Sequence, residues 1–194
     1  MQSKLILATT VCLIIFPACF FFFADFQYLP VKSRFLASVF QSVTPRTAGF
    51  NTVDITMMTE ASKVVMILLM LIGGSPGSTA GGMKTTTFAV LLLNAVATFK
   101  SQEHAGAFGR RIDDQVIKNA ATIAMLYFMM FLAGGIVIST AEGLPILSSL
   151  FEAASAMGTV GLTLRVTPSL HRISLFVLIL LMYMGRVGGL TLIY

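Results

Sequence analysis

Two short Thr-x-Gly segments carry the residue types from which a site for a dehydrated cation is built. The first is Thr47-Ala48-Gly49-Phe50-Asn51 and the second is Thr159-Val160-Gly161-Leu162. An alkali cation that sheds its water needs a ring of oxygens, and backbone carbonyls supply them without fixed charge. Turning successive carbonyls toward one axis demands dihedral angles that glycine adopts at low cost. We therefore expect these segments to form an ion filter, with the threonine hydroxyls at its inner end.

The second segment is a loose repeat of the first, with Gly161 in the place of Gly49. Other features recur at the offset that separates these two glycines: the apolar run 5–24 maps onto 117–136, 64–72 onto 176–184, and Gly73-Gly74 onto Gly185-Arg186. Agreement of four features at one offset indicates two tandem copies of one unit.

A short, half-apolar stretch precedes each Thr-x-Gly segment: Phe35–Thr44 in the first copy and Ile146–Met157 in the second. Both stretches are too short to cross a bilayer, which takes about 20 residues. Irregular backbone following them at membrane depth is tolerated only beside water or inside protein. The partly negative C-terminal ends of two such helices would favour a cation. The alternative is a surface loop with a conveniently placed glycine, which would not explain the repeat.

The composition indicates that lipid surrounds most of the chain. Hydrophobic residues make up 56% of its 194 residues and charged residues 11%, whereas soluble domains carry about 25% charged residues. The first apolar run, 5–24, is uncharged and of spanning length, and the sequence at its end is a poor signal-peptide cleavage site. We expect an all-α integral membrane fold of two tandem helix–pore loop–helix units.

The expected organisation is a first unit over residues 1–98, a linker over 99–118 and a second unit over 119–194. The linker is polar, and two pore-loop units place it on the side opposite the filters. Positive-inside counting favours the cytoplasm for the linker, although cationic residues on the filter side leave the orientation weakly determined by charge. Those residues are Lys32, Arg34, Arg46, Lys63, Arg165 and Arg172.

Several other classes of function are disfavoured. The net charge of +5 is too diffuse for a nucleic-acid footprint. Cys12 and Cys19 lie seven apart in one apolar run, where we expect buried packing residues without a metal or a disulfide. His104 and His171 have no carboxylate or cysteine cluster near them on which to build a catalytic set, and the acidic residues outside the apolar runs, Glu142 among them, are expected to be solvated. Neither an enzyme nor a resident cofactor is expected.

The stretch Gly73–Lys84 interrupts the second spanning helix of the first unit. Five glycines and one proline in twelve residues cannot remain helical. A phosphate-binding loop is disfavoured because Met83 separates Gly82 from Lys84, and a merely kinked helix is the plainer alternative. We expect an irregular gate beneath the filter. The gating residues would be Gly73, Gly74, Ser75, Pro76, Gly77, Ser78, Thr79, Ala80, Gly81, Gly82 and Lys84, together with Arg186.

Arg186 lies deep in the last apolar run, where a charge is costly and usually faces a cavity or a partner. Its alternative is to snorkel to the interface from a helix end. For Arg46 and Glu152, two interpretations stand side by side: bracing the filter from behind, or ordinary interfacial charges.

Three separated motifs resemble the Trk/Ktr/HKT potassium-transporter superfamily, and most of all the membrane subunit of the bacterial Ktr system. They are Thr44–Asp54, Gly73–Thr85 and Met184–Gly188, and they occur in the family's order. The resemblance covers essentially the whole chain. It implies potassium transport across the cell membrane, the bacterial inner membrane above all, either passive or by symport, with or without dependence on sodium.

The resemblance further implies a mobile intramembrane gating loop at Gly73–Lys84 and a pore-facing Arg186. It also implies a homodimer embedded in membrane lipid, and a cytosolic regulatory subunit that binds nucleotide. The family carries four units, and the two here resemble the third and fourth, so they form half of a four-unit, potassium-channel-like pore. Either the first two units are missing or two chains combine; we favour an incomplete chain. A non-conducting fragment and a less selective sodium/potassium pathway are the alternative functions.

Overall fold

The computed structural model describes residues 2–102, 104–108 and 110–187. The helices are α1 (Gln2–Ala24), α2 (Val31–Val43), α3 (Glu60–Leu71), α4 (Thr85–Phe99), α5 (Asp114–Glu142), α6 (Ile146–Met157) and α7 (Arg172–Val187). Short 3-10 turns occur at Phe26–Tyr28, Ile55–Met57 and Thr167–Ser169. The antiparallel strands β1 (Gly106–Ala107) and β2 (Arg110–Arg111) form a small hairpin between the units.

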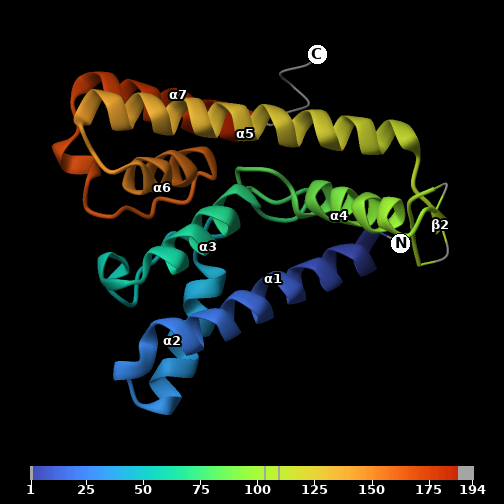
Figure 1. The fold of residues 1–194 in the computed structure, drawn as a ribbon, viewed down its shortest axis with the longest axis horizontal. Coiled ribbons are helices and arrows are strands. Elements are labelled where there is room, and N and C mark those ends of the chain that lie inside the picture. The colour runs from blue at the N-terminus through green and yellow to red at the C-terminus, as the bar shows by residue number, and fades with distance from the viewer. Residues whose placement is uncertain (1, 103, 109, 188–194) are drawn as a thin grey trace.

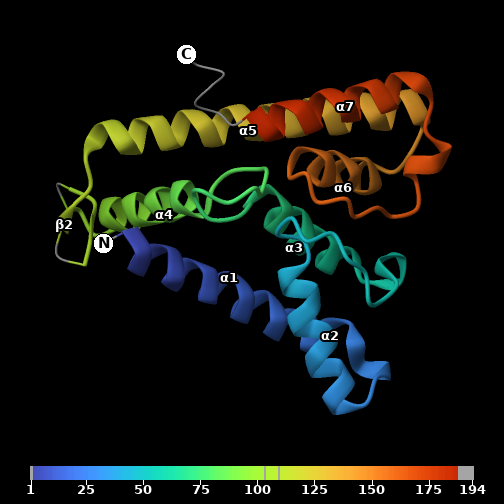
Figure 2. The same cartoon turned by 180° about the vertical axis from the view of Figure 1, so that it is seen from behind.

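The helices pack in the order that two tandem units require. In the second unit α5 and α7 lie side by side, and α6 packs against both (Figure 1). In the first unit α1 packs against α2 and α4, while α3 packs against α6 of the other unit. Figure 2 shows the same arrangement from behind, with the hairpin and the N-terminus at one end of the molecule. The expected all-α architecture is therefore correct.

Helix lengths separate spanning elements from the short ones. Among the described residues, α1 and α5 are long and apolar enough to cross a membrane. Helix α2 starts directly after Pro30 and α6 directly after Pro145, because the proline ring fixes φ and offers no N–H to an earlier turn. Gly143, with φ of +66°, ends α5 and turns the chain back toward α6. Helix α5 begins at Asp114, within the stretch expected to be linker.

A repeated carboxylate tie joins the first helix of each unit to the second. Asp25, just after α1, accepts hydrogen bonds from the Thr59 N–H at 2.8 Å and from the Ser62 hydroxyl. Glu142, at the end of α5, accepts from the His171 N–H at 2.8 Å and from the Ser174 hydroxyl at 2.5 Å. The offset that carries Gly49 onto Gly161 also carries Thr59 and Ser62 onto His171 and Ser174. The donor positions thus follow the repeat offset, whereas the carboxylates do not, because the offset carries Asp25 onto Val137.

The expectation of a solvated Glu142 is wrong. Its side chain is only 5% exposed, and the Nδ1 atom of His171 lies 2.7 Å from its second oxygen. The sequence placed the carboxylate outside an apolar run but did not show that the start of α7 would fold over it.

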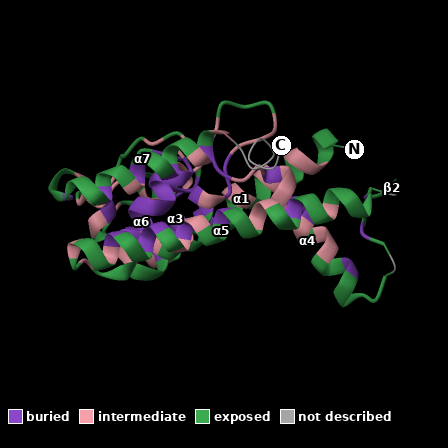
Figure 3. Cartoon of the chain, turned by 90° about the horizontal axis from the view of Figure 1, so that it is seen from above, coloured by how far each residue is buried: buried purple, intermediate pink, exposed green. Residues whose placement is uncertain are grey.

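The core is centred on α6 (Figure 3). Ser149 and every residue from Phe151 to Met157 are buried in this short helix, between α3, α5 and α7. Its serines and alanines let neighbouring helices approach closely, as in other membrane bundles. Much of α1, by contrast, faces outward: Cys12 and Cys19 are exposed, so the expectation that both are buried is wrong.

Candidate functional site

The two Thr-x-Gly segments lie side by side, although they are far apart in the sequence. A Cβ atom placed on Gly49 would lie 2.1 Å from the Val160 carbonyl oxygen and 3.9 Å from the Gly161 Cα. N–H groups of each segment donate hydrogen bonds to carbonyl groups at the C-terminal end of the short helix that precedes it. The N–H groups of Ala48 and Gly49 donate to the Thr44 carbonyl at 3.2 and 3.1 Å, and the Val160 N–H donates to the Ser155 carbonyl at 2.8 Å.

Both segments share an unusual backbone. Gly49 and Gly161 have φ of +73° and +88°, and Thr47 and Thr159 have φ of +65° and +50°. The glycine values agree with the reason for expecting glycine there. A β-branched residue at positive φ is a genuine outlier; it costs about 1–3 kcal/mol and persists only where the surrounding structure enforces it. In each segment, a strained threonine therefore lies two residues before a glycine at positive φ.

The interruption of the second helix is a closed loop rather than a kink. Helix α3 ends at Leu71 and α4 begins at Thr85. Ile72 and Met83 form a parallel β-bridge at the base of the loop, where the Gly73 N–H donates to the Met83 carbonyl at 2.8 Å.

This loop lies against the second filter segment and against α7. A Cβ on Gly81 would lie 2.4 Å from the Thr159 Oγ1 atom. The Gly82 N–H donates to the Gly185 carbonyl at 3.3 Å. The loop is therefore in contact with the threonine that precedes Gly161, where a gate would have to act.

Two cations hold the loop through its carbonyls. Arg186 donates to the Thr79 carbonyl, and the Lys84 Nζ donates to the Ala80 carbonyl at 2.5 Å. Arg186 is exposed, in the last described turn of α7. Its contact with the loop favours the cavity-facing interpretation over snorkelling. Gly188, part of the third motif, lies outside the described residues.

The sequence left the roles of Glu152 and Arg46 open, and the two side chains differ in their hydrogen bonds. Glu152 is 4% exposed. It accepts hydrogen bonds from the stretch that follows the second filter segment: from the Thr163 hydroxyl at 2.6 Å, the Leu164 N–H at 2.9 Å and the Thr167 hydroxyl at 2.6 Å. Arg46 makes no comparable contact among the described residues, and its Nε atom is buried without a partner.

Sequence reasoning missed two other contacts at the filters. The Thr44 hydroxyl donates to the Phe50 carbonyl at 2.6 Å, across the first segment. Asp54 and Arg165, which follow the two segments, form an ion pair at 3.0 Å between the units. The repeat offset could have pointed to the second contact, because it places Asp54 at position 166, next to Arg165.

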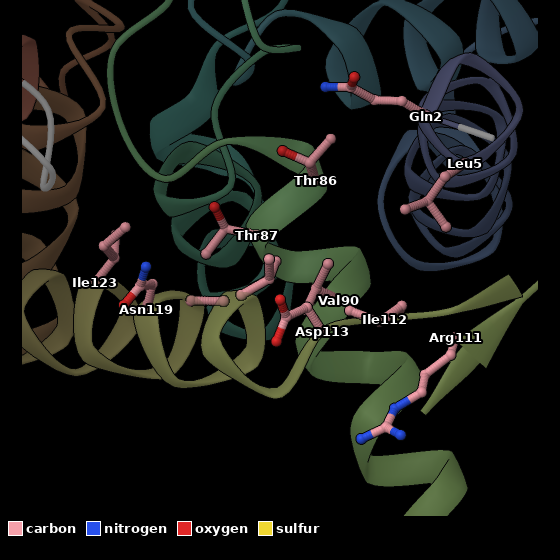
Figure 4. Close-up of a pocket in the computed structure, with 12 residues that line it drawn as sticks. Gln2, Leu5, Thr86, Thr87, Val90, Arg111, Ile112, Asp113, Asn119 and Ile123 are labelled. Carbon is pink, nitrogen blue, oxygen red and sulfur yellow. The ribbon is translucent and has the colours of Figure 1, made fainter. Parts of the chain in front are cut away.

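One cavity lies at the site and a larger one lies apart from it. The first, of about 420 Å³, is lined by Glu152, Thr159, Gly161 and Thr167, among others. The second, of about 510 Å³, lies near the hairpin and is lined by residues of α1, α4 and α5 (Figure 4), none of which belongs to either segment. The described residues contain no group of three or more His, Cys, Asp or Glu that could hold a metal ion.

Comparison with known proteins gives consistent matches. The family model TrkH, described as a cation transport protein, matches residues 1–194. The chain is 38% identical to the potassium/sodium uptake protein NtpJ of Enterococcus hirae, over 100% of this chain and 45% of that protein. It is 35% identical to the Ktr system potassium uptake protein B of Bacillus subtilis, over 86% of this chain and 38% of that protein.

Among solved structures, the potassium transporter TrkH from Vibrio parahaemolyticus matches with a TM-score of 0.80 at 23% identity. The match covers 96% of this chain and 42% of that one, and it shows the fold. The chain spans less than half the length of each of these proteins.

Proposed function

Because the chain belongs to the TrkH family of cation transport proteins, we propose that it forms half of a potassium-selective pore. It is a multi-pass protein of the cell membrane. Potassium would pass the carbonyls of Thr47–Asn51 and Thr159–Leu162, and the loop Gly73–Lys84 would gate the pore from below. Neither an enzymatic step nor a resident cofactor is part of this proposal.

The observation that carries the proposal is the pairing of the two segments. They lie in contact, each follows a short helix of the length expected for a pore helix, and each has positive φ at the same two positions. Two segments supply half of the oxygens of a four-sided ring, so the remaining half must come from further units or from a second chain.

The gate is supported by contact and by charge. The loop touches Thr159, and Arg186 donates to its Thr79 carbonyl. A cation in the pore beneath the filter would meet this arginine. The loop and the arginine would therefore restrict flux together, one by occupying space and the other by repulsion.

The assembly is proposed as a homodimer in membrane lipid, with a cytosolic nucleotide-binding regulatory subunit. Its membrane part would comprise the units 1–98 and 119–194, with 99–118 as the linker. Two relatives are named as proteins B and D of a Ktr system, and a named system of several proteins supports a partner subunit.

A less selective sodium/potassium pathway is the second candidate. The relative NtpJ is named as a potassium/sodium uptake protein and is 38% identical to this chain. Sodium would then be either a second permeant ion or the coupling ion.

The test is ion uptake in a bacterial host that lacks its own potassium uptake systems. The chain is expressed alone, and also in place of the matching segment of the Bacillus subtilis protein B. Initial rubidium and sodium influx are normalised to protein in the membrane.

We expect rubidium influx with sodium excluded, and we expect Gly161→Ser to lower the rubidium-to-sodium ratio, because a side chain disturbs the carbonyl ring. Sodium influx equal to rubidium influx in the unmodified protein would favour the second candidate. An unchanged ratio in Gly161→Ser would count against the filter assignment.

A further inference from the structure

We propose that Glu152 is a positioning residue of the second filter segment. Its buried carboxyl group fixes the backbone directly after Leu162 through hydrogen bonds. This inference rests on the proposed pore and adds a residue-level account of what holds one of its two segments in place.

Both carboxyl oxygens of Glu152 accept hydrogen bonds, from three donors in all. One carboxylate oxygen accepts from the Thr163 hydroxyl and from the Leu164 N–H, and the other accepts from the Thr167 hydroxyl. The two hydroxyl oxygens lie 3.0 Å apart. Each hydroxyl has one proton to give, and both threonines can give theirs to the carboxylate. Glu152 thereby pins both ends of the stretch 163–167 to α6.

The carboxyl group is buried beside the second segment. None of the ion pairs among the described residues involves Glu152. A buried ionisable side chain inside a membrane protein is usually tied to function. Glu152 lines the same cavity as Thr159 and Gly161, so its hydrogen bonds act directly beside the second segment.

The first unit has no equivalent of this residue. At the repeat offset, the position that corresponds to Glu152 is Phe40, and the first segment is instead held by the hydroxyl of Thr44 at the Phe50 carbonyl. The proposal therefore predicts a local effect. Loss of the carboxylate should loosen the second segment and leave the first unchanged.

The primary experiment measures hydrogen exchange on the full chain, purified in detergent. Peptides covering 159–164 and 47–52 are followed in the unmodified protein, in Glu152→Gln and in Phe40→Leu as the matched control. Glutamine keeps the shape but replaces one acceptor oxygen by a donor. Either the Thr167 hydroxyl or both Thr163 and Leu164 then lose their acceptor, and in both cases the stretch 163–167 is held less firmly to α6. We expect exchange at Leu164 to rise about tenfold, the scale of losing one buried hydrogen bond, with 47–52 unchanged. Phe40→Leu should leave Leu164 unchanged.

Two further variants guard against a Glu152→Gln protein that does not fold. Glu152→Asp keeps the charge but withdraws it by one methylene, and Thr167→Val removes one donor while keeping the carboxylate. Both should raise exchange at Leu164 by less than Glu152→Gln does. Unchanged exchange at Leu164 in every folded variant would overturn the proposal, as would an equal rise in 47–52.

Transport measurements separate a role at the filter from a purely structural role, because a purely structural role would leave the KM for rubidium and the rubidium-to-sodium ratio unchanged. In the host used above, Glu152→Gln should raise the KM for rubidium and lower the rubidium-to-sodium ratio, and Glu152→Asp should restore part of both. An unchanged KM and ratio in a Glu152→Gln protein with raised Leu164 exchange would overturn the role at the filter. If the unmodified chain supports no rubidium influx even in place of the matching segment of the Bacillus subtilis protein B, while Leu164 exchange responds as expected, the pore assignment fails and the positioning of 163–167 by Glu152 stands.

Discussion

The two units share a backbone plan and differ in how its parts are held. Both tie the first helix to the second through a carboxylate, Asp25 or Glu142, and both place a threonine and a glycine at positive φ. A single hydroxyl braces the first filter segment, whereas a buried carboxylate with three donors braces the second. The repeat thus preserves the path of the chain, while the residues that stabilise it have diverged.

The second helices differ in the same sense. In the first unit the helix is broken by the loop between α3 and α4, and in the second unit α7 continues unbroken through its described residues. The loop of the first unit touches the filter segment of the second unit. Each half therefore contributes what the other lacks: one supplies the loop that we propose as the gate, and the other supplies the segment that this loop contacts and the arginine that donates to it.

The largest expected difference between the units concerns their filter glycines. Alanine at positive φ costs about 1–2 kcal/mol at either site. At Gly49 the added Cβ would also collide with the Val160 carbonyl, whereas at Gly161 nothing lies within 4 Å of it. We expect Gly161→Ala to fold with a Tm lower by a few degrees, and Gly49→Ala to lose the folded state. Thermal unfolding in detergent, with size-exclusion chromatography as the check on folding, separates the two. Equal losses of Tm would contradict the contact between the segments.

Deletion of Ser75–Gly81 tests the role of the loop that interrupts the second helix of the first unit. The bridge between Ile72 and Met83 already closes the base of the loop, so Gly74 joined to Gly82 should be tolerated. We expect rubidium influx to rise because an obstruction is removed from the pore while α3 and α4 stay in place. A deletion that abolishes both membrane insertion and influx would show that the loop is structural.

Much of this organisation could be predicted from the sequence, because it rests on lengths and periods. The absence of charge in 5–24, the shortness of Ile146–Met157 and the glycines of Gly73–Lys84 each express a local constraint. Such constraints fix which stretches span, which end within the membrane and which cannot be helical. The structure has a long apolar helix over the first stretch, a short helix over the second and a loop over most of the third.

The contacts between distant residues could not be predicted in this way. Glu152 looked equally suited to an interface, because its partners lie after the filter segment and are ordinary threonines. Glu142 looked solvated, because the His171 and Ser174 groups that contact it lie at the start of α7, about 30 residues further along the chain. In both cases the deciding fact is which polar groups fold over a carboxylate, and no spacing in the sequence encodes it.

The two units also differ at Arg186, because the equivalent position in the first unit is Gly74. At an effective dielectric of 20, two unit charges ~8 Å apart repel by about 2 kcal/mol, which corresponds to roughly thirtyfold in rate. Arg186→Gln should raise the maximal rubidium influx by up to this factor and leave the rubidium-to-sodium ratio unchanged. In the deletion background the gain should be smaller, since the hold on Thr79 is already gone. An unchanged or lower maximal rate at equal protein in the membrane would sink the pore-facing assignment.

The smallest expected effect concerns the Asp54–Arg165 pair, which joins the outer ends of the two segments. Donation from the Thr56 hydroxyl and the Thr56 N–H holds the pKa of the Asp54 carboxyl below its ordinary value, and Arg165 adds a lesser attraction. A lowered folded-state pKa contributes stability that is fully present above the unfolded value of about 3.9 and is lost as the pH falls through the folded value. Asp54→Asn should therefore lower the Tm slightly at pH 7, and the difference should vanish once the pH falls below the folded-state pKa of the carboxyl. Because the contacts within the first unit outweigh the contact between units, Arg165→Gln should lower the Tm at pH 7 by less than Asp54→Asn does. The reverse order would mean that the pair, rather than the turn around Thr56, holds the outer ends of the two segments together.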